Sequence, residues 1–271
     1  MTASDFCQRW TDRTHSWRHT SEGGFDPARY DVAPIPEAMA RDYVNRHHYS
    51  GSYPAARQRY GLFDGSELVG VAVLSVPVRA AVLTGVFPDL EPYQESLELG
   101  RFVLAQDVPA NGESWFLAQM FRQAAAAGIR GIVSFSDPMP RQAGDIVVMP
   151  GHVGTIYQST NALYLGRGRA RALLMLPDAT VLNDRSISKV KAQQRGHEYV
   201  ERKLMAYGAP APRAGQDPSV WLEEALLAIG TRRVQHQGNH RYALPLGTRR
   251  ERRLLRIPLE RQSYPKLADA A

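Results

Sequence analysis

The sequence has one cysteine, Cys7, among 271 residues, and it has no run of 18 apolar residues. A single cysteine excludes a disulfide framework and cysteine-rich zinc sites, and a reducing compartment is the simplest setting. Without a long apolar run we expect no membrane-spanning helix. The first residues are polar and lack the apolar segment of a signal peptide. We therefore expect a soluble, cytoplasmic protein.

Lysine is absent from residues 1–166, which contain 13 arginines and 17 acidic residues. Residues 167–271 reverse this balance, with 20 basic and 10 acidic residues. An acidic body followed by a basic region is typical of a protein that binds a polyanion. The clustering of the charge favours nucleic acid, and the alternative is a charge that serves solubility alone.

Two common catalytic patterns are also missing. There is no G-x-S-x-G elbow, which argues against a Ser-His-Asp hydrolase. No histidine pair has HExxH spacing or another closed pattern of metal ligands. The hydrophobic fraction of 44% is that of an ordinary globular protein, and the length suffices for one large or two small domains.

The apolar pattern predicts a mixed α/β fold. Asp64-Gly65 lies between two alternating segments, so residues 58–63 and 67–78 are expected to pair as an antiparallel hairpin. The strand ELGRFVL, a helix opened by Asn111 and the strand IVSFSD then form a β-α-β unit with parallel strands. We expect a mixed, mostly antiparallel sheet with helices on both faces.

Three regions follow from this pattern. Residues 1–33 are expected to form a loosely structured N-terminal arm, and residues 34–180 the α/β domain. Residues 181–271 form a basic C-terminal extension, which begins with one basic helix at 183–206 and ends in a proline-punctuated tail.

The segment Asn111-Gly112-Glu113-Ser114 opens the helix of the β-α-β unit. Free backbone N–H groups and the positive end of the helix dipole attract phosphates at such a position. These four residues are therefore candidates for binding a cofactor, and the alternative is an ordinary helix cap.

Two further polar groups occur where elements end. Ser134, Ser136 and Asp137 close a buried strand, and ligands collect at the carboxyl ends of parallel strands. The alternative for the aspartate is a turn before a proline. His48 and Tyr49 follow a helix, where they are candidates for acid/base or metal-ligand chemistry or form a solvated helix end.

The segment GHVGTIYQSTNALYLG, residues 151–166, predicts a short helix at 153–160 and a strand. His152, Tyr157 and Asn161 make it unusually polar for a core helix. If it follows IVSFSD in the sheet, its start opens toward the same crevice as Asp137. We interpret these three side chains as the wall of a site, with helix capping as the alternative.

Several segments together resemble one known family. HYSG, the GLFDGSELVGV hairpin, ELGRFVL, NGESWFL, IVSFSDP and GHVGTIYQSTNALYLG occur in the order and spacing of the Mom proteins of phage Mu and related phages. The resemblance covers about residues 36–176. It implies a GNAT (N-acetyltransferase-like) fold and an enzyme that converts adenine in DNA to an N6-(methylcarbamoyl)-type derivative, which protects the DNA from restriction.

The pyrophosphate loop departs from the GNAT pattern. GNAT enzymes usually carry R/Q-x-x-G-x-G/A there, whereas this chain has AQDVPANGES. The resemblance therefore implies acetyl-CoA through the fold and not through the motif, and another activated donor stays open.

The resemblance assigns roles by position. His48 and Tyr49 match its HY(S) element, Arg101 the arginine after E-L, Asp137 the S-D and Tyr157 the Y-Q. Arg101 would hold a phosphate of the donor or of DNA. Asp137 and His48 would deprotonate or orient the exocyclic amine, or ligate iron. Tyr157 would supply a phenol donor, with Tyr49 beside it.

A duplex hides adenine N6 inside its stack, so the enzyme must bend the DNA or flip the base. Asn161 would then read an adenine edge through paired hydrogen bonds, with His152 nearby. The basic helix and tail would hold the phosphates of double-stranded DNA. Their candidate residues are Lys189, Lys191, Arg195, Arg202, Lys203, Arg249 and Arg250.

Two other functions remain open at this point. A GNAT acyltransferase acting on a small molecule or a protein amine explains residues 36–176 but not the basic region. A non-catalytic DNA-binding protein explains the charge but not the polar groups at the strand ends.

Overall fold

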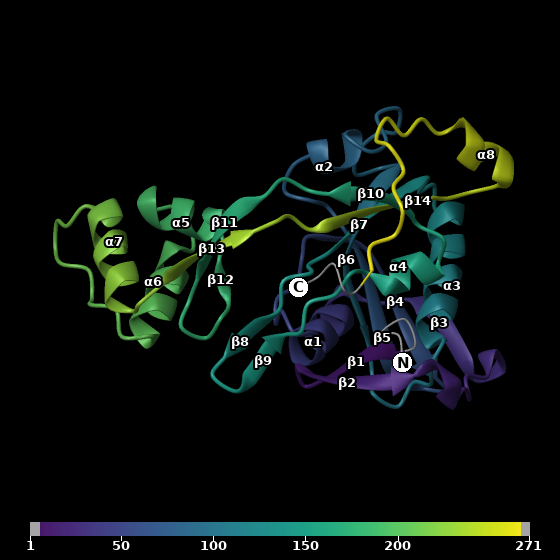
Figure 1. The fold of residues 1–271 in the computed structure, drawn as a ribbon, viewed down its shortest axis with the longest axis horizontal. Coiled ribbons are helices and arrows are strands. Elements are labelled where there is room, and N and C mark those ends of the chain that lie inside the picture. The colour runs from purple at the N-terminus through teal and green to yellow at the C-terminus, as the bar shows by residue number, and fades with distance from the viewer. Residues whose placement is uncertain (1–5, 267–271) are drawn as a thin grey trace. The chain divides into compact units, whose positions relative to one another are not determined.

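The computed structural model describes residues 6–266, and the chain divides into two units (Figure 1). Unit 1 takes in the chain up to Pro138, His152–Arg167 and the chain from Asn239. Unit 2 takes in Met139–Gly151 and Gly168–Gly238. No helix among the described residues has the length and apolar character that a membrane crossing requires.

Unit 1 is built on a seven-stranded sheet with the order β10-β14-β7-β6-β5-β4-β3. All neighbouring strands are antiparallel except β6 and β7, so the mixed, mostly antiparallel sheet is confirmed. Its strands are β3 (Tyr30–Pro34), β4 (Ala56–Asp64), β5 (Glu67–Ser75), β6 (Ser96–Leu104), β7 (Gly131–Ser136), β10 (Leu163–Arg167) and β14 (His240–Pro245).

The hairpin of β4 and β5 confirms the Asp64-Gly65 signal. Asp64 pairs with Glu67, and Gly65 has a φ of 59°, a left-handed conformation that favours glycine in tight turns.

The parallel strands β6 and β7 separate part-way along their length. They pair only from Ser96↔Gly131 to Glu98↔Val133. Beyond that point β6 continues along β5 and β7 continues along β14. Side chains from both faces of the sheet can therefore meet in the space between the two strands.

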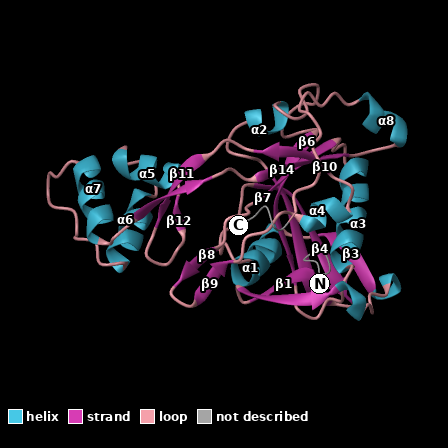
Figure 2. Ribbon diagram, in the orientation of Figure 1, coloured by secondary structure: helices cyan, strands magenta, loops and turns pink. Residues whose placement is uncertain are grey.

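Helices cover both faces of this sheet, as expected (Figure 2). On one face, α3 (Gly112–Ala126) and α4 (Thr155–Ser159) pack on a core that includes Phe116, Leu97 and Leu244. On the other face, α1 (Glu37–His47) packs on Val71, Val73 and Val103 of β5 and β6. The short helix α2 (Ala81–Thr84) packs beside β7 and β14. A last helix, α8 (Arg249–Leu254), follows β14.

The N-terminal arm is more ordered than the sequence predicts. It forms an antiparallel hairpin of β1 (Phe6–Thr11) and β2 (Thr14–His19), followed by 3-10 turns at Thr20–Glu22 and Pro27–Arg29. Trp10 of β1 is buried in the core below α1, which anchors the hairpin to the sheet.

Unit 2 contains a hairpin, a small sheet and three helices. Its core includes the buried Trp221, whose Nε1 donates to the carbonyl oxygen of Pro210 at 2.9 Å. The single basic helix expected at 183–206 is wrong, because Gln193 and Gly196 adopt positive φ and break it. The elements are β8 (Arg141–Ala143), β9 (Ile146–Met149), β11 (Arg171–Met175), β12 (Val181–Leu182), β13 (Arg232–His236), α5 (Asp184–Lys191), α6 (His197–Ala206) and α7 (Pro218–Ala228).

The division into units differs from the three regions drawn from the sequence. Strand β14 pairs with β7 and β10, so the end of the chain completes the central sheet of unit 1. The basic residues of the C-terminal region are consequently shared between the two units.

Candidate active site

Polar side chains gather where β6 and β7 separate. Ser134 of β7 is fully buried, and its Oγ donates to the carbonyl oxygen of Leu99 on β6 at 3.4 Å. Tyr157 of α4 approaches the same point from the α3 face, where its hydroxyl bonds Ser134 and lies 3.5 Å from the carbonyl oxygen of Phe135. The strand gap is thus lined by polar groups inside an otherwise apolar core.

His48 lies directly after α1 and is almost completely buried. Its Nδ1 accepts from the backbone N–H of Ser50 at 3.2 Å and contacts Ser50 Oγ at 2.9 Å. Burial holds the pKa of this imidazole well below its usual range, and Arg101 and His152 lower it further. The ring is therefore neutral, with its proton on Nε2, so His48 presents a hydrogen-bond donor to the site.

Arg101 of β6 is fixed by backbone and hydroxyl oxygens. Its Nε donates to the carbonyl oxygen of Ser52 at 2.9 Å, Nη2 to Ser52 Oγ at 2.9 Å and Nη1 to the carbonyl oxygen of Gly100 at 2.6 Å. Burial lowers the pKa of the guanidinium, while Tyr49 and Glu98 raise it. Arg101 remains a cation and supplies a fixed positive charge beside His48.

Burial raises the pKa values of two acid/base groups at the strand gap, Glu98 and Tyr157. Burial raises the pKa of the Glu98 carboxyl above its usual range, against the opposing influence of Arg101. Burial raises the pKa of Tyr157 to about 12, and Tyr49 and Glu98 add to this. The strand gap therefore holds a carboxylate of increased basicity and a phenol that stays protonated at neutral pH.

Asp137 and His152 complete the group. The backbone N–H of His152 donates to the carbonyl oxygen of Asp137 at 2.9 Å. Burial lowers the pKa of the His152 imidazole, while the nearby Asp137 carboxylate raises it. His152 and Arg101 both lower the pKa of His48, so the three cationic or basic side chains influence one another electrostatically.

The structure thus brings together six of the residues that the sequence selects: His48, Tyr49, Arg101, Asp137, His152 and Tyr157. Ser136 is the last residue of β7, directly before Asp137, and its buried Oγ has no hydrogen-bond partner among the described residues. The arrangement combines a base, a neutral imidazole donor, a fixed cation and a phenol, which suits attack of an amine on an activated carbon.

A family model of the Mom proteins matches residues 29–266. The chain belongs to the Mom protein family. The match supports a role in the modification of phage DNA.

Solved acetyltransferases are similar to this Mom-family chain only loosely. An acetyltransferase of Bacillus subtilis in complex with CoA has a TM-score of 0.35 and 12% identity, covering 81% of this chain and 99% of its own. A GNAT acetyltransferase of Elizabethkingia anophelis with bound acetyl-CoA has a TM-score of 0.34 and 10% identity, covering 80% and 99%. An IAA acetyltransferase of Bacillus cereus has a TM-score of 0.31 and 11% identity, covering 80% and 99%. Among curated proteins none matches the chain significantly.

The start of α3 does not fit the pyrophosphate of a CoA donor. Arg9 of β1 is fully buried there and pairs with Glu113, the acidic residue of the first turn. Arg9 also donates to the carbonyl oxygens of Val108 at 3.0 Å and Pro109 at 2.8 Å. A carboxylate and an N-terminal strand therefore occupy the position where the sequence predicts phosphates.

The other residues expected to bind a cofactor have structural roles. Gly112 packs so closely on Val108 and Phe25 that an added Cβ would lie 2.6 Å and 3.2 Å from their side chains. Asn111 precedes α3 with a φ of 76° and caps it with no side-chain hydrogen bond. Ser114 Oγ donates to the carbonyl oxygen of Asn111 at 3.1 Å. If the Mom family uses a CoA donor, its phosphates must bind elsewhere.

The two residues proposed to ligate iron, His48 and Asp137, are not part of a cluster of three potential metal ligands among the described residues. Within residues 6–266, no three His, Cys, Asp or Glu side chains lie close enough together to hold one metal ion. The Nδ1 atom of His48 is moreover engaged by Ser50. His48 and Asp137 therefore do not fit an iron site by themselves.

The polar residues of the segment 151–166 fall into two groups. His152 and Tyr157 face the strand gap described above. Gln158 instead bonds the buried Tyr242, and Ser159 Oγ donates to the carbonyl oxygen of Ile156 at 2.8 Å. Asn161 follows α4 with a φ of 59°, a conformation that asparagine tolerates at a helix end, and its exposed side chain lines a separate pocket.

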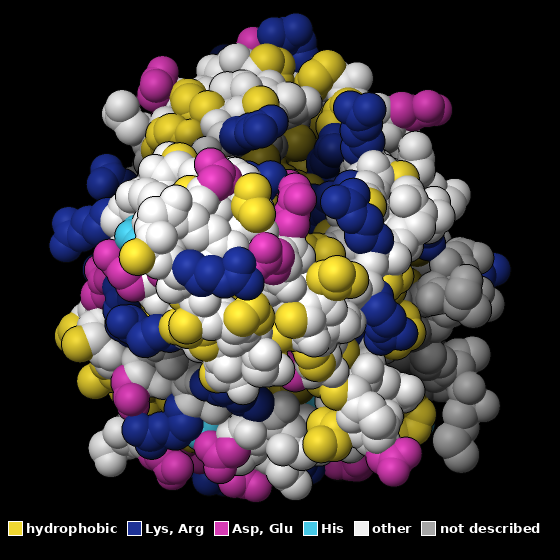
Figure 3. Space-filling model, turned by 90° about the vertical axis from the view of Figure 1, so that its left-hand side faces the viewer, with side chains coloured by type: hydrophobic (Ala, Val, Ile, Leu, Met, Phe, Trp, Pro, Cys, Tyr) yellow, Lys and Arg dark blue, Asp and Glu magenta, His cyan; other side chains and the backbone are white. Residues whose placement is uncertain are grey.

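The basic residues expected to contact DNA are distributed over α5, α6, the connection between them, which contains Arg195, and α8. In unit 2, Lys191, Arg195 and Arg202 are exposed, whereas Lys189 and Lys203 are half-buried. On the face shown in Figure 3, Lys and Arg side chains alternate with Asp, Glu and hydrophobic ones. In unit 1, Arg249 and Arg250 of α8 are exposed.

The sequence interpretation missed Glu98 and Arg9. Glu98 lies between Leu97 and Leu99, and a charged residue between two core residues of a strand was the available signal. Arg9 carries no comparable signal, because its buried partners lie about one hundred residues further along the chain.

Proposed function

We propose that this protein transfers a methylcarbamoyl-type group from an activated small-molecule donor to N6 of adenine in DNA. The observation that carries the proposal is the group of Glu98, His48, Arg101 and Tyr157 at the strand gap of a Mom-family chain. The donor must already carry the methylcarbamoyl-type group on a leaving group, because transfer of the acetyl group of acetyl-CoA to N6 would give N6-acetyladenine and free CoA. Acetyl-CoA, which the family resemblance implies, is therefore tested beside such a donor, and the mass of the modified nucleoside distinguishes the two products.

Each side chain has a role in bond formation at N6. The lone pair of N6 is delocalised into the purine, so the amine needs a base as it attacks. Glu98 takes that proton, because burial makes its carboxylate more basic than usual. His48 Nε2–H and the Arg101 guanidinium stabilise negative charge that develops on the donor. As N6 bonds to the transferred carbon, the bond from that carbon to the rest of the donor breaks, and Tyr157, still protonated at neutral pH, donates a proton to the departing part.

The remaining residues orient the reactants. The backbone N–H of His152 donates to the carbonyl oxygen of Asp137, and we assign Asp137 the role of orienting His152, whose ring in turn influences the pKa of His48. Adenine N6 reaches this half-buried group only when the base leaves the stack, which supports a flipped base as substrate. The exposed basic residues of α5 and α6 would bind DNA phosphates.

The product of a co-expressed plasmid tests the proposal. Plasmid DNA isolated from cells that express the protein is digested to nucleosides and analysed by mass spectrometry. We expect a deoxyadenosine of increased mass with the wild type and none with Asp137→Ala, while Asp145→Ala, in an exposed hairpin turn, keeps full activity. Gel retardation should show that Asp137→Ala still binds DNA. Unmodified plasmid from the wild type, together with transfer to small amines, would overturn the proposal.

Charge reversal in unit 2 provides a separate prediction. Lys191→Glu with Arg195→Glu should weaken duplex binding and reduce the slope of log K against log salt by about 0.9 for each phosphate that is no longer bound. Fluorescence anisotropy at several salt concentrations measures this slope. Arg79→Glu changes an exposed arginine of unit 1 and should have a smaller effect. An unchanged slope would show that α5 and α6 do not contact DNA.

A further inference from the structure

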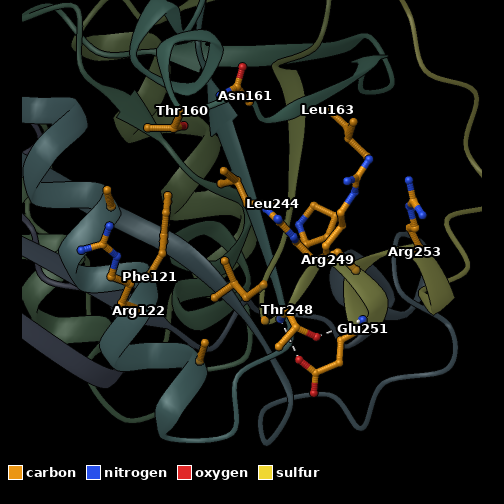
Figure 4. A pocket seen from close by; sticks show the side chains of 16 residues that line it. Phe121, Arg122, Thr160, Asn161, Leu163, Leu244, Thr248, Arg249, Glu251 and Arg253 are labelled. Carbon is orange, nitrogen blue, oxygen red and sulfur yellow. Dashed lines mark hydrogen bonds between the residues drawn. The ribbon is translucent and has the colours of Figure 1, made fainter.

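A pocket of about 790 Å³ lies in unit 1 beside α8, away from the strand gap. Figure 4 shows Arg249 and Arg253 on one side of it, Phe121 and Arg122 of α3 on the other, and Leu244 of β14 between them. The volume is in the range of ordinary small-ligand sites.

The rim of this pocket carries positive charge that no carboxylate neutralises. Arg249, Arg252 and Arg253 are exposed and make no side-chain hydrogen bond or ion pair with any described residue. Arg122 has only a long contact of 3.4 Å with Gln119. These four arginines come from α3 and α8, which lie far apart in the sequence.

The one acidic residue of the rim is fully engaged. Glu251 Oε1 accepts from Arg130 Nη1 at 2.8 Å, and Oε2 accepts from the backbone N–H of Thr248 at 2.7 Å. Thr248 Oγ1 in turn accepts from the N–H of Glu251, which closes a capping box at the start of α8. Glu251 therefore positions α8 and leaves the arginines free for an anion.

The floor of the pocket is apolar. It is formed by Phe121, Leu163 and Leu244, and the amide of Asn161 lies at its edge. An apolar floor beside unpaired arginines suits a ligand with phosphates and a flat, weakly polar part. A nucleotide has both, because its base stacks on aromatic and aliphatic side chains while its phosphates bind arginine.

Packed aromatic rings lie between the floor of the pocket and the strand gap. Tyr157, Tyr164 and Tyr242 are buried and packed together there, with ring centroids 5.1 Å and 5.3 Å from Tyr242. The three rings belong to the same buried core cluster as Leu244 of the pocket floor. Along β14, Leu244 of the pocket floor is four residues from His240, which pairs with Ser136 beside Asp137. The pocket floor and the Asp137 end of the strand gap are therefore about 13 Å apart along the strand.

We propose that this pocket binds the DNA strand beside the target adenine, with the arginines on its phosphates and an unstacked base or sugar on Phe121. A DNA strand crosses about 13 Å over the protein surface in about four base-pair steps. This inference rests on the proposed function in one respect, namely that DNA is the substrate. It adds a second binding region that helps to hold the strand open after the base has flipped.

Binding measurements test the pocket independently of catalysis. The probe is a fluorescein-labelled 12-nucleotide single strand, and its anisotropy is read at several salt concentrations. The triple variant Arg249→Ala, Arg252→Ala, Arg253→Ala should bind it more weakly and reduce the salt slope by about 0.7 for each phosphate of the single strand that is no longer bound. Phe121→Leu keeps an apolar floor but removes the ring, and should weaken binding about 5-fold or more.

Neighbouring residues give the matched control. Arg250 is adjacent to Arg249 on α8 but does not line the pocket. Arg249→Ala should therefore weaken binding more than Arg250→Ala, whereas equal losses of affinity would mean that α8 acts only as diffuse charge. Thermal unfolding of each variant checks that α8 and α3 remain folded.

A competitor separates DNA from the donor. Adenosine 3′,5′-bisphosphate carries the nucleotide part of CoA. If the triple variant no longer binds this bisphosphate but keeps its DNA affinity, the pocket belongs to a donor and the proposal is overturned. If the wild type binds the strand through the pocket yet plasmid DNA stays unmodified, the pocket stands and the proposed function fails.

Discussion

Glu98→Gln is expected to lower the rate of adenine modification by about 100- to 10,000-fold, the usual contribution of a general base. Gln has the shape of Glu but accepts no proton, so N6 must attack while still carrying both hydrogens. DNA affinity should not change, because Glu98 lies at the strand gap and not among the exposed basic residues. Modified nucleosides per unit time, measured by mass spectrometry, give the ratio of the rates.

The pH dependence identifies the role of Glu98 more sharply than the rate alone. Its pKa is raised by burial, so the carboxylate form disappears as pH falls through a value above that of an ordinary glutamate. Wild-type activity should therefore fall on the acidic side at that raised value. The pKa values of His48 and His152 are lowered, so neither ring gains a proton at neutral pH. Glu98→Gln should have no such acidic limb.

Stability gives the control for this variant. A carboxyl whose pKa is higher in the folded state binds its proton more tightly there, so its ionised form destabilises the fold at neutral pH. Glu98→Gln should consequently unfold at the same temperature as the wild type or a higher one. Glu67→Gln, at an exposed position of β5, should change neither rate nor stability. Full activity of Glu98→Gln would exclude Glu98 as the base.

Arg9→Met is expected to cost about 3–5 kcal/mol in the free energy of unfolding, which is the usual effect when one partner of a buried ion pair is removed. The substitution leaves Glu113 buried without its counter-ion and the carbonyls of Val108 and Pro109 without their donor. Denaturant unfolding followed by circular dichroism measures the change. A lower midpoint with an unchanged slope would show reduced stability and not a changed unfolded state.

Two variants separate burial from ion pairing as such. Arg46→Met breaks an exposed pair with Asp42 four residues earlier on α1, and should cost about 0.5 kcal/mol or less. The double change Arg9→Met, Glu113→Met removes both buried charges and should recover part of the stability. If Arg9→Met and Arg46→Met lower the free energy of unfolding by the same amount, the β1-β2 hairpin does not hold α3 through the buried Arg9–Glu113 pair.

Local signals in the sequence were sufficient for most of the central sheet. The Asp64-Gly65 turn and the β6-α3-β7 unit follow from nearby residues, because alternation and turn chemistry act over a few positions. Strand β14 could not be predicted, since its pairing with β7 depends on contacts across more than one hundred residues. The break between α5 and α6 was missed, because glutamine rarely adopts a positive φ and its type gives no sign that Gln193 does so here.

The candidate site was predicted in part for the same reason. His48, Asp137 and Tyr157 follow from polar residues at the ends of elements, and the structure brings them together. The start of α3 was predicted to bind phosphate, because a helix start after a strand often does. The Arg9–Glu113 ion pair that occupies this position could not be seen in the local sequence, so the expected roles of Gly112 and Glu113 do not fit the structure.

The route of the chain through unit 1 affects how the protein can be made and rearranged. Arg167 pairs with His240, and next to them Gly168 and Gly238 approach so closely that a Cβ on Gly238 would lie 2.1 Å from the carbonyl oxygen of Gly168. The chain therefore leaves the sheet and returns to it at one point, as in a domain insertion. During synthesis on the ribosome, the edge of β7 that pairs with β14 stays unpaired until β14 has been made. A chain in which a short turn joins Arg167 directly to Asn239 should pair β14 with β7 as soon as β10 is made, and fold without Gly168–Gly238, the larger segment of unit 2.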